Sequence, residues 1–154
     1  MRGYLHISMT YQLSVAIFGP GISEHAHWGF VIHQSPSPHG DLLHVRLIDI
    51  PSNRFIFENR SGHGLESQNA WGLCKISLLD HAQRSKVISI LSSEKPPSGG
   101  TKDCQDWVID ALVTLEVEEL VPARTAHNWS SRIGKQTDAI KSEVGINWNS
   151  LNGR

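Results

Sequence analysis

Long apolar segments are missing from this 154-residue sequence. No run approaches the roughly 20 residues that cross a bilayer, and residues 1–11 lack the unbroken apolar stretch of a secretory signal. Cysteine is also scarce, because Cys74 and Cys104 are the only two. Two cysteines make no disulfide framework, and a chain of this length does not need one. We therefore expect reduced thiols, a cytoplasmic location and no stable membrane anchor.

An excess of charge of either sign is missing as well. The 14 Lys and Arg residues are matched by 15 Asp and Glu residues, which gives a net charge of −1 with neutral histidines. This balance offers no basic surface to a nucleic-acid backbone, so no nucleic-acid partner is expected. The composition, 39% hydrophobic and 19% charged, is that of an ordinary globular protein. The length fits one domain over residues 1–154.

Several motifs of known chemistry are absent too. The sequence contains no CxxC pair, no HExxH and no GxSxG. The segment Ser61-Gly62-His63-Gly64 resembles a flexible loop and lacks the lysine of a phosphate-binding loop. His25 and His27 could contribute to a metal site, but no further ligands follow at zinc-like spacing. Neither a cofactor nor a metal is therefore expected.

The pattern that is present consists of strands followed by helices. Short, partly alternating apolar segments between turn residues predict about five strands, at residues 12–18, 27–33, 42–50, 54–58 and 71–78. Apolar residues repeating every three or four positions predict helices over residues 80–92, 103–120 and 133–144. This order predicts an α+β fold in which an antiparallel sheet packs against helices.

Cys104 is predicted to lie in the first turn of the helix 103–120. Asp103 and Asp106 have the spacing of a capping box, so the thiol would lie near free N–H groups and the positive end of the helix dipole. Both carboxylates oppose ionisation of the thiol, so a histidinium would be needed to lower its pKa. Alternatively, Cys104 shares a helical stripe with Trp107 and is simply a buried apolar residue. Cys74 lies in an apolar strand and is expected to belong to the core.

Two histidines on predicted strands are candidate partners for this thiol. His27 and His25 alternate and are expected to share one strand face, with Trp28 on the other. His44 lies among apolar neighbours, where an imidazole needs a polar partner. A second imidazole that orients the first would meet this need, as the third group of a triad orients the base.

Three segments in this order resemble the circularly permuted papain-like hydrolases, the grouping of NlpC/P60-related and lecithin:retinol acyltransferase-like proteins. His27-Trp28-Gly29-Phe30-Val31 is similar to their histidine strand, and Gly40-Asp41-Leu42-Leu43-His44-Val45 to the strand that follows it. Asp103-Cys104-Gln105-Asp106-Trp107 is similar to the start of their cysteine helix, with Asp in place of the usual Asn and of the usual His.

The resemblance implies a permuted papain-like fold in which Cys104 is the nucleophile, His27 the base and His44 the residue that orients the base. His39 is a rival for the orienting position, although it is expected in a Pro/Gly-rich loop. The implied activity is that of a hydrolase or acyltransferase acting on an ester, thioester or amide of a small molecule or peptide, and such an enzyme could serve in biosynthetic tailoring. Two alternatives stay open. They are a desumoylase-like isopeptidase with a Cys–His dyad, and a catalytically silent protein-interaction module of the same fold.

Overall fold

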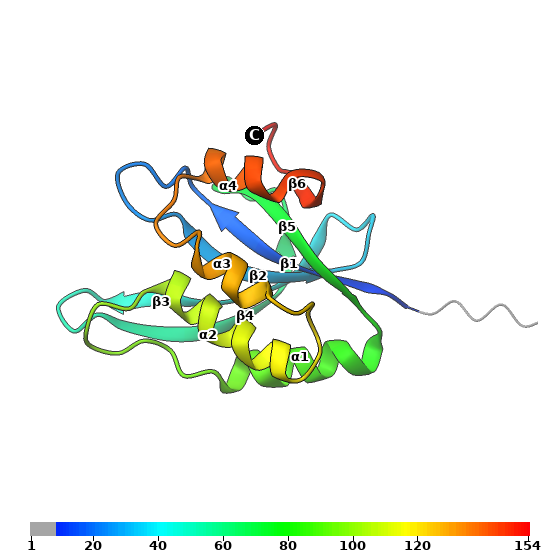
Figure 1. Ribbon diagram of the computed structural model, residues 1–154, viewed down its shortest axis with the longest axis horizontal. Coiled ribbons are helices and arrows are strands. Elements are labelled where there is room, and N and C mark those ends of the chain that lie inside the picture. Colours follow the sequence, from blue (N-terminus) through cyan, green and yellow to red (C-terminus); the bar gives the residue numbers. More distant parts are fainter. Residues whose placement is uncertain (1–8) are drawn as a thin grey trace, which may run out of the picture.

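The computed structural model describes residues 9–154. The expectation for the N-terminal segment falls mostly on residues 1–8, which lie outside this range. Six antiparallel strands form one sheet in the order β4-β3-β2-β1-β5-β6 (Figure 1). The strands are β1 Tyr11–Phe18, β2 His27–His33, β3 His39–Asp49, β4 Arg54–Gly64, β5 Ala70–Leu79 and β6 Trp148–Ser150. The helices are α1 His81–Ser93, α2 Cys104–Val117, α3 Thr125–Ser130 and α4 Thr137–Val144, followed by the 3-10 turn η1 Gly145–Asn147.

The four helices pack on one face of the sheet, and the predicted α+β class is confirmed (Figure 1). Their apolar side chains share one core with alternate residues of the central strands. In β2, Trp28 and Phe30 point into this core and meet Trp129 of α3 and Trp107 of α2 at ring-centroid distances of 5.1 and 5.8 Å. Because side chains alternate along a strand, His27 and His33 point to the other face. A smaller apolar cluster that includes Val31 and Leu42 covers part of that second face.

The structure departs from the expected strands where pairing between distant segments determines the number and the bounds of the strands. The sheet has six strands, because the short β6 pairs with β5 from Gly72↔Ser150 to Cys74↔Trp148. β4 continues to Gly64 through residues 61–64, which were expected to form a loop, because β3 pairs with it along most of its length. Likewise β3 begins at His39. The helix α3 was not predicted, and α4 begins four residues after the expected position 133.

Close packing between β2 and β3 depends on the glycine at position 29, which has no side chain. A Cβ atom at Gly29 would lie 2.8 Å from the Cβ atom of His44, closer than real Cβ atoms come. Glycine at this position lets His44 lie directly against β2, two residues from His27.

Within residues 9–154, no helix is long and apolar enough to cross a membrane.

Candidate active site

The N-terminus of α2 is built as the sequence predicts. Asp103 is the N-cap, and its Oδ1 accepts a hydrogen bond from the backbone N–H of Gln105 at 2.9 Å. The backbone N–H of Asp103 donates to Oδ2 of Asp106 at 2.9 Å, which completes the capping box. Cys104 is therefore the first residue of a firmly capped helix, with its side chain 8% exposed.

A chain of three hydrogen-bonded side chains runs across β2, β3 and β4. Nε2 of His27 lies 2.7 Å from Nδ1 of His44, and Nε2 of His44 lies 2.9 Å from Oε1 of Glu58. The register β3–β4 places His44 directly opposite Glu58, so both side chains share one face. Arg60 and Arg46 in turn reach the carboxylate of Glu58 at 3.1 and 3.5 Å.

These contacts determine which nitrogen of His27 can act as a base. Glu58 as a carboxylate only accepts, so Nε2 of His44 carries the proton and its Nδ1 accepts. His27 then donates from Nε2, which leaves its Nδ1 with a free lone pair. The hydrogen-bond network thus assigns a tautomer in which Nδ1 of His27 can take a proton from a thiol.

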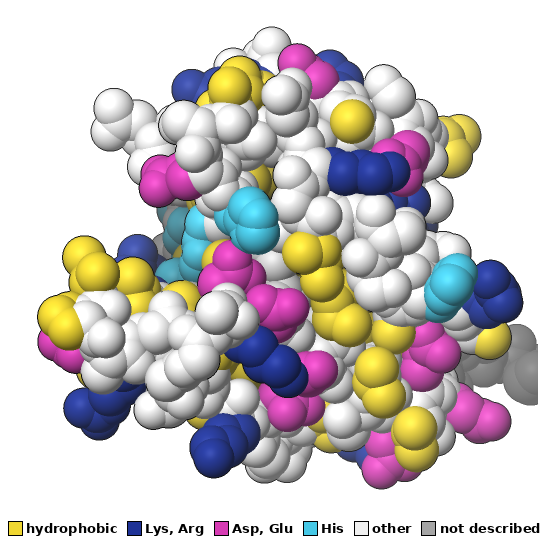
Figure 2. All heavy atoms as spheres, turned by 60° about the vertical axis from the view of Figure 1, so that its left-hand side comes forward, with side chains coloured by type: hydrophobic (Ala, Val, Ile, Leu, Met, Phe, Trp, Pro, Cys, Tyr) yellow, Lys and Arg dark blue, Asp and Glu magenta, His cyan; other side chains and the backbone are white. Residues whose placement is uncertain are grey.

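Cys104 belongs to the core on the helical side of the sheet, and the His27 and His44 side chains lie on the other face, but all three line one cavity at the end of β2. β2 pairs with β3 from Phe30↔Leu43 to His33↔Gly40, and His27 lies beyond the paired stretch, near the N-terminus of α2. A cavity of about 560 Å³ opens at this end, lined by Glu24, His25, His27, His44, Arg46, Leu47, Phe55, Asp103 and Cys104. Figure 2 shows histidine side chains beside acidic ones in a recess of the surface. No hydrogen bond joins the thiol to the His27 ring among these described residues, so the two groups share a cavity without forming a preformed pair.

Burial dominates the protonation of both groups. It raises the pKa of the Cys104 thiol to about 12, which the backbone N–H of Trp28 opposes and the carboxylate of Asp103 reinforces. Burial, followed by the nearby His44, lowers the pKa of His27 to about 4. The expected thiolate–histidinium pair is thus not the resting state, because no histidinium faces the thiol near neutral pH. The resting site holds a neutral thiol and a neutral imidazole.

Backbone N–H groups around the sulfur offset part of the cost of burial. Those of Trp28, Gln105 and Cys104 itself lie near the sulfur, and each lowers the pKa of the thiol. Donors fixed around a reacting atom stabilise negative charge as it develops. The site can therefore support a thiolate that forms only during reaction.

Two residues of the site were not singled out from the sequence. Glu58 ends the imidazole chain, and it could have been found only from the pairing of β3 with β4. Gln105 is fully buried; its Nε2 donates to the carbonyl of Ala26 and its Oε1 accepts from the N–H of Gly134, both at 2.9 Å. Gln105 thus ties the α2 N-terminus to the segment that leads into β2.

The other candidate histidines occupy different positions. His25 lies before β2, not on it, and the expected shared strand face with His27 is therefore wrong. Its Nδ1 instead lies 2.8 Å from Oδ2 of Asp103. His39 is exposed and lines a different cavity with His33, so His44 is the imidazole that contacts His27. Among the described residues, no three His, Cys, Asp or Glu side chains are placed to hold a metal ion.

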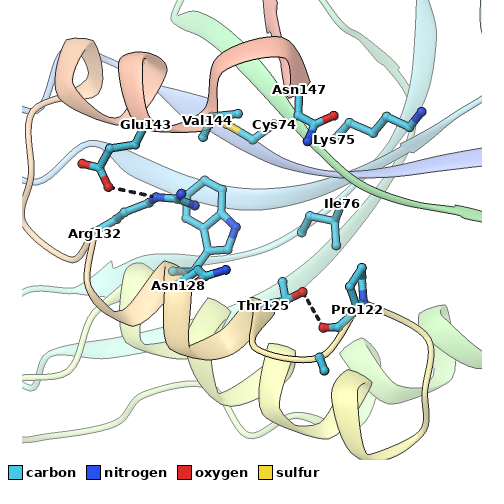
Figure 3. A pocket seen from close by; sticks show the side chains of 12 residues that line it. Cys74, Lys75, Ile76, Pro122, Thr125, Asn128, Arg132, Glu143, Val144 and Asn147 are labelled. Carbon is cyan, nitrogen blue, oxygen red and sulfur yellow. Dashed lines mark hydrogen bonds and ion pairs between the residues drawn. The ribbon is translucent and has the colours of Figure 1, made fainter.

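Cys74 has different surroundings. It lies in the middle of β5, between Val15 of β1 and Trp148 of β6, and its side chain is 1% exposed. It lines a cavity of about 310 Å³ in which Arg132 pairs with Glu143 (Figure 3). None of the residues that line this cavity is a histidine. The sequence interpretation of Cys74 as a core residue agrees with this position.

Comparison with known proteins gives a family but no function. A model described as "Family of unknown function (DUF6540)" matches residues 14–122. The matched segment contains His27, His44, Glu58 and Cys104, and it covers more than half of the chain. No curated protein and no solved structure matches the chain.

Proposed function

The chain belongs to the DUF6540 family, and we propose that it is a thiol-dependent hydrolase or acyltransferase that forms an acyl-enzyme on Cys104. The observation that carries the proposal is the chain His27–His44–Glu58, which ends in the cavity that also contains the thiol. A nucleophile, a base within one cavity and a third group that orients the base are the parts that covalent catalysis needs.

The proposed first half-reaction begins from the neutral pair. A carbonyl group in the cavity is attacked by Sγ of Cys104 while Nδ1 of His27 takes the thiol proton. His44 and Glu58 stabilise the imidazolium that forms. As the tetrahedral intermediate collapses, His27 returns the proton to the leaving group, and the bond from the carbonyl carbon to that group breaks. The backbone N–H of Cys104 lies near the oxyanion in this arrangement.

The resemblance to permuted papain-like proteins supports this assignment of roles. The order of base strand, orienting strand and cysteine helix is that of the NlpC/P60-related and lecithin:retinol acyltransferase-like grouping, and we propose a permuted papain-like architecture for the chain. The substrate class is an ester, thioester or amide of a small molecule or peptide, as for a biosynthetic tailoring enzyme. In a desumoylase-like isopeptidase, by contrast, His44 and Glu58 would be dispensable because a Cys–His dyad suffices.

One observation favours a second candidate, a catalytically silent interaction module. Burial and the Asp103 carboxylate both raise the pKa of Cys104, so the thiol is protonated at neutral pH. If His27 cannot remove this proton, Cys104 is only a buried apolar residue.

Acyl transfer from p-nitrophenyl acetate distinguishes the two candidates. After incubation near neutral pH, peptide mapping by mass spectrometry should find the acetyl group on Cys104, with Cys74 unmodified, and Cys104→Ala should abolish the release of p-nitrophenolate above the solution rate. Iodoacetamide should show the same preference for Cys104. Equal, slow labelling of both cysteines, with no acetyl-enzyme, would leave the interaction module as the better interpretation.

A further inference from the structure

A second imidazole–carboxylate pair lies next to the nucleophile. Nδ1 of His25 lies 2.8 Å from Oδ2 of Asp103, the residue immediately before Cys104. The two oxygens of Asp103 have different partners, because Oδ1 accepts from the N–H groups of Gln105 and Asp106 at the start of α2. One carboxylate therefore both caps the nucleophile helix and holds His25.

This contact sets the tautomer of His25. A carboxylate only accepts, so the proton of a neutral His25 lies on Nδ1 and the lone pair on Nε2. On the Nε2 side stands Gly134, where a Cβ atom would come within 3.3 Å of Nε2. Gly134 has a φ of +77° and its N–H donates to the buried Gln105, so the backbone beside the ring is fixed. The free nitrogen of His25 is thus held in place and is not enclosed by a neighbouring side chain at residue 134.

His25 lies between two cavities. It lines the cavity of about 560 Å³ that contains Cys104, and also a cavity of about 360 Å³ bounded by residues 18–27 and Asn69. His27 borders both cavities too, whereas Cys104 lines only the larger one. A small molecule in the smaller cavity would therefore meet imidazoles without displacing an acyl group from the larger cavity.

We propose that His25 is the general base of the second half-reaction, and that the acyl acceptor, water or a small alcohol or amine, arrives through the smaller cavity. This inference rests on the proposed acyl-enzyme at Cys104. Nε2 of His25 takes a proton from the acceptor while the acceptor oxygen or nitrogen bonds to the thioester carbon. The bond from that carbon to Sγ breaks, and the departing thiolate takes the proton back from His25.

The two histidines suit different halves of the reaction because their surroundings differ. His27 is hydrogen-bonded to His44, and its ring lies against that of Phe18 at a centroid distance of 5.5 Å. The side chain of His25 is 49% exposed, so it can meet an acceptor that comes from solvent. Asp103 acts as a positioning residue, because it fixes the His25 tautomer in the way that the triad carboxylate fixes that of its histidine.

Burst kinetics with p-nitrophenyl acetate test the inference. The wild-type protein should release p-nitrophenolate in a burst equal to the enzyme concentration, followed by slower turnover. His25→Asn should keep the amplitude and rate of the burst and lower the steady rate at least about tenfold, since general bases contribute about 10²–10⁴-fold. Hydroxylamine, a strong nucleophile that needs no base, should restore turnover of the variant. His127→Asn, at an exposed histidine of α3, is the matched control and should change neither phase.

Asp103→Asn provides an independent variant. Asparagine is an equally good N-cap, so α2 stays capped. Its amide N–H groups cannot accept the proton of His25 Nδ1, so a loss of turnover is again expected. The substitution also removes a charge that raises the pKa of Cys104, so the burst should not slow while turnover falls. An unchanged steady rate in His25→Asn, or a burst that falls together with turnover, would overturn the role of His25 and leave the acyl-enzyme intact. A wild-type protein with no burst and no acetyl group on Cys104 would instead overturn the proposed function.

Discussion

The two cysteines of this chain are almost equally buried, yet only Cys104 lines a cavity that also contains imidazoles. Burial raises the pKa of each thiol to about 12, so protonation at rest does not distinguish them. Cys104 begins α2, and backbone N–H groups near its sulfur, that of Trp28 foremost, lower the pKa of the thiol. Cys74 lies mid-strand, where the backbone groups are used by the sheet on both sides. The two thiols therefore differ in the groups that surround them, and hardly in the extent of their burial.

The two thiols also differ in the basic side chains that line their cavities. The Cys104 cavity contains imidazoles, whose ring nitrogens can accept a proton from the thiol and return it during a reaction. The Cys74 cavity contains the guanidinium of Arg132, which stacks over Trp129 at 4.7 Å and pairs with Glu143. Arg132 lowers the Cys74 pKa slightly, but a guanidinium keeps its protons and accepts none. Positive charge alone therefore does not make a nucleophile of a cysteine.

The largest expected effect separates the two cysteines outright. Cys104→Ala should remove all acyl-enzyme and all turnover above the solution rate, because no other group can take the place of the sulfur. Cys74→Ala should retain turnover within about twofold. Steady-state release of p-nitrophenolate with both purified variants measures this, with circular dichroism as the control for folding. An active Cys104→Ala protein would break the comparison.

The next effect concerns the base. His27→Ala should lower kcat/KM for p-nitrophenyl acetate about 10²–10⁴-fold, the usual contribution of a general base. In the proposed mechanism His27 removes the proton of the neutral thiol, so the burst should slow by the same factor. Stopped-flow measurement of the burst checks this. A burst rate unaffected by His27→Ala would show that the Cys104 thiol ionises without the imidazole.

Acid should destabilise the His27 side of the molecule. Burial lowers the pKa of His27 from 6.5 to about 4, so between these values the unfolded chain binds a proton that the folded chain does not. Stability therefore rises with pH across this window and is lost as pH falls through it. His27 contributes about 3 kcal/mol to that loss, and burial lowers the pKa of His33, His44 and His63 in the same direction.

Urea unfolding near pH 7 and near pH 4.5 measures this contribution. His27→Gln should be less sensitive to acid than the wild type, and the exposed control His127→Gln should match the wild type. Identical acid sensitivity in all three proteins would mean that His27 is not protonated more readily in the unfolded chain.

Local sequence patterns predicted the start of the cysteine helix, whereas the contacts of Glu58 and Gln105 depend on pairing between distant segments. Adjacent residues determine the Asp103 cap and the position of Cys104, so spacing alone could place them. Glu58 lies 14 residues from His44 and is brought to it by strand register, which single-sequence patterns specify poorly. The buried Gln105 bonds to Ala26 and Gly134, which no periodicity relates.

Burial was the other quantity that the sequence could not provide. From the sequence, a histidinium would be needed to lower the pKa of Cys104, whereas the packed structure removes water from both groups and favours their neutral forms. His25 was expected on a strand, but its contact with Asp103 lies outside the sheet. The strand β6 escaped prediction because Trp148 packs on Gly72, a position where a Cβ atom would overlap the indole ring.

The loss of kcat/KM should become smaller with each residue of the chain His27–His44–Glu58. His44→Ala should lower kcat/KM about tenfold to a hundredfold, less than His27→Ala, because a group that orients the base costs less than the base itself. Glu58→Gln should cost less again, since Glu58 is one bond further away and its side chain is 27% exposed. Parallel kinetics of the three variants measure the gradient. Equal activity of His44→Ala and wild type would favour the dyad.

The smallest expected effect compares one substitution at both cysteines. Serine replaces a tolerant sulfur with a hydroxyl that needs hydrogen bonds when buried. At Cys104 the N–H of Trp28 can donate to that oxygen, whereas Cys74 has only burial and the charge of Arg132 acting on it. Cys74→Ser should therefore lower the free energy of unfolding by about 1 kcal/mol more than Cys104→Ser, the scale of an unmade hydrogen bond. Urea unfolding near pH 7 measures the difference, and the two alanine variants control for lost volume. If both serine variants lose equal stability, the N–H groups around Cys104 do not stabilise an oxygen there, and the same groups would then contribute little to an oxyanion or a thiolate.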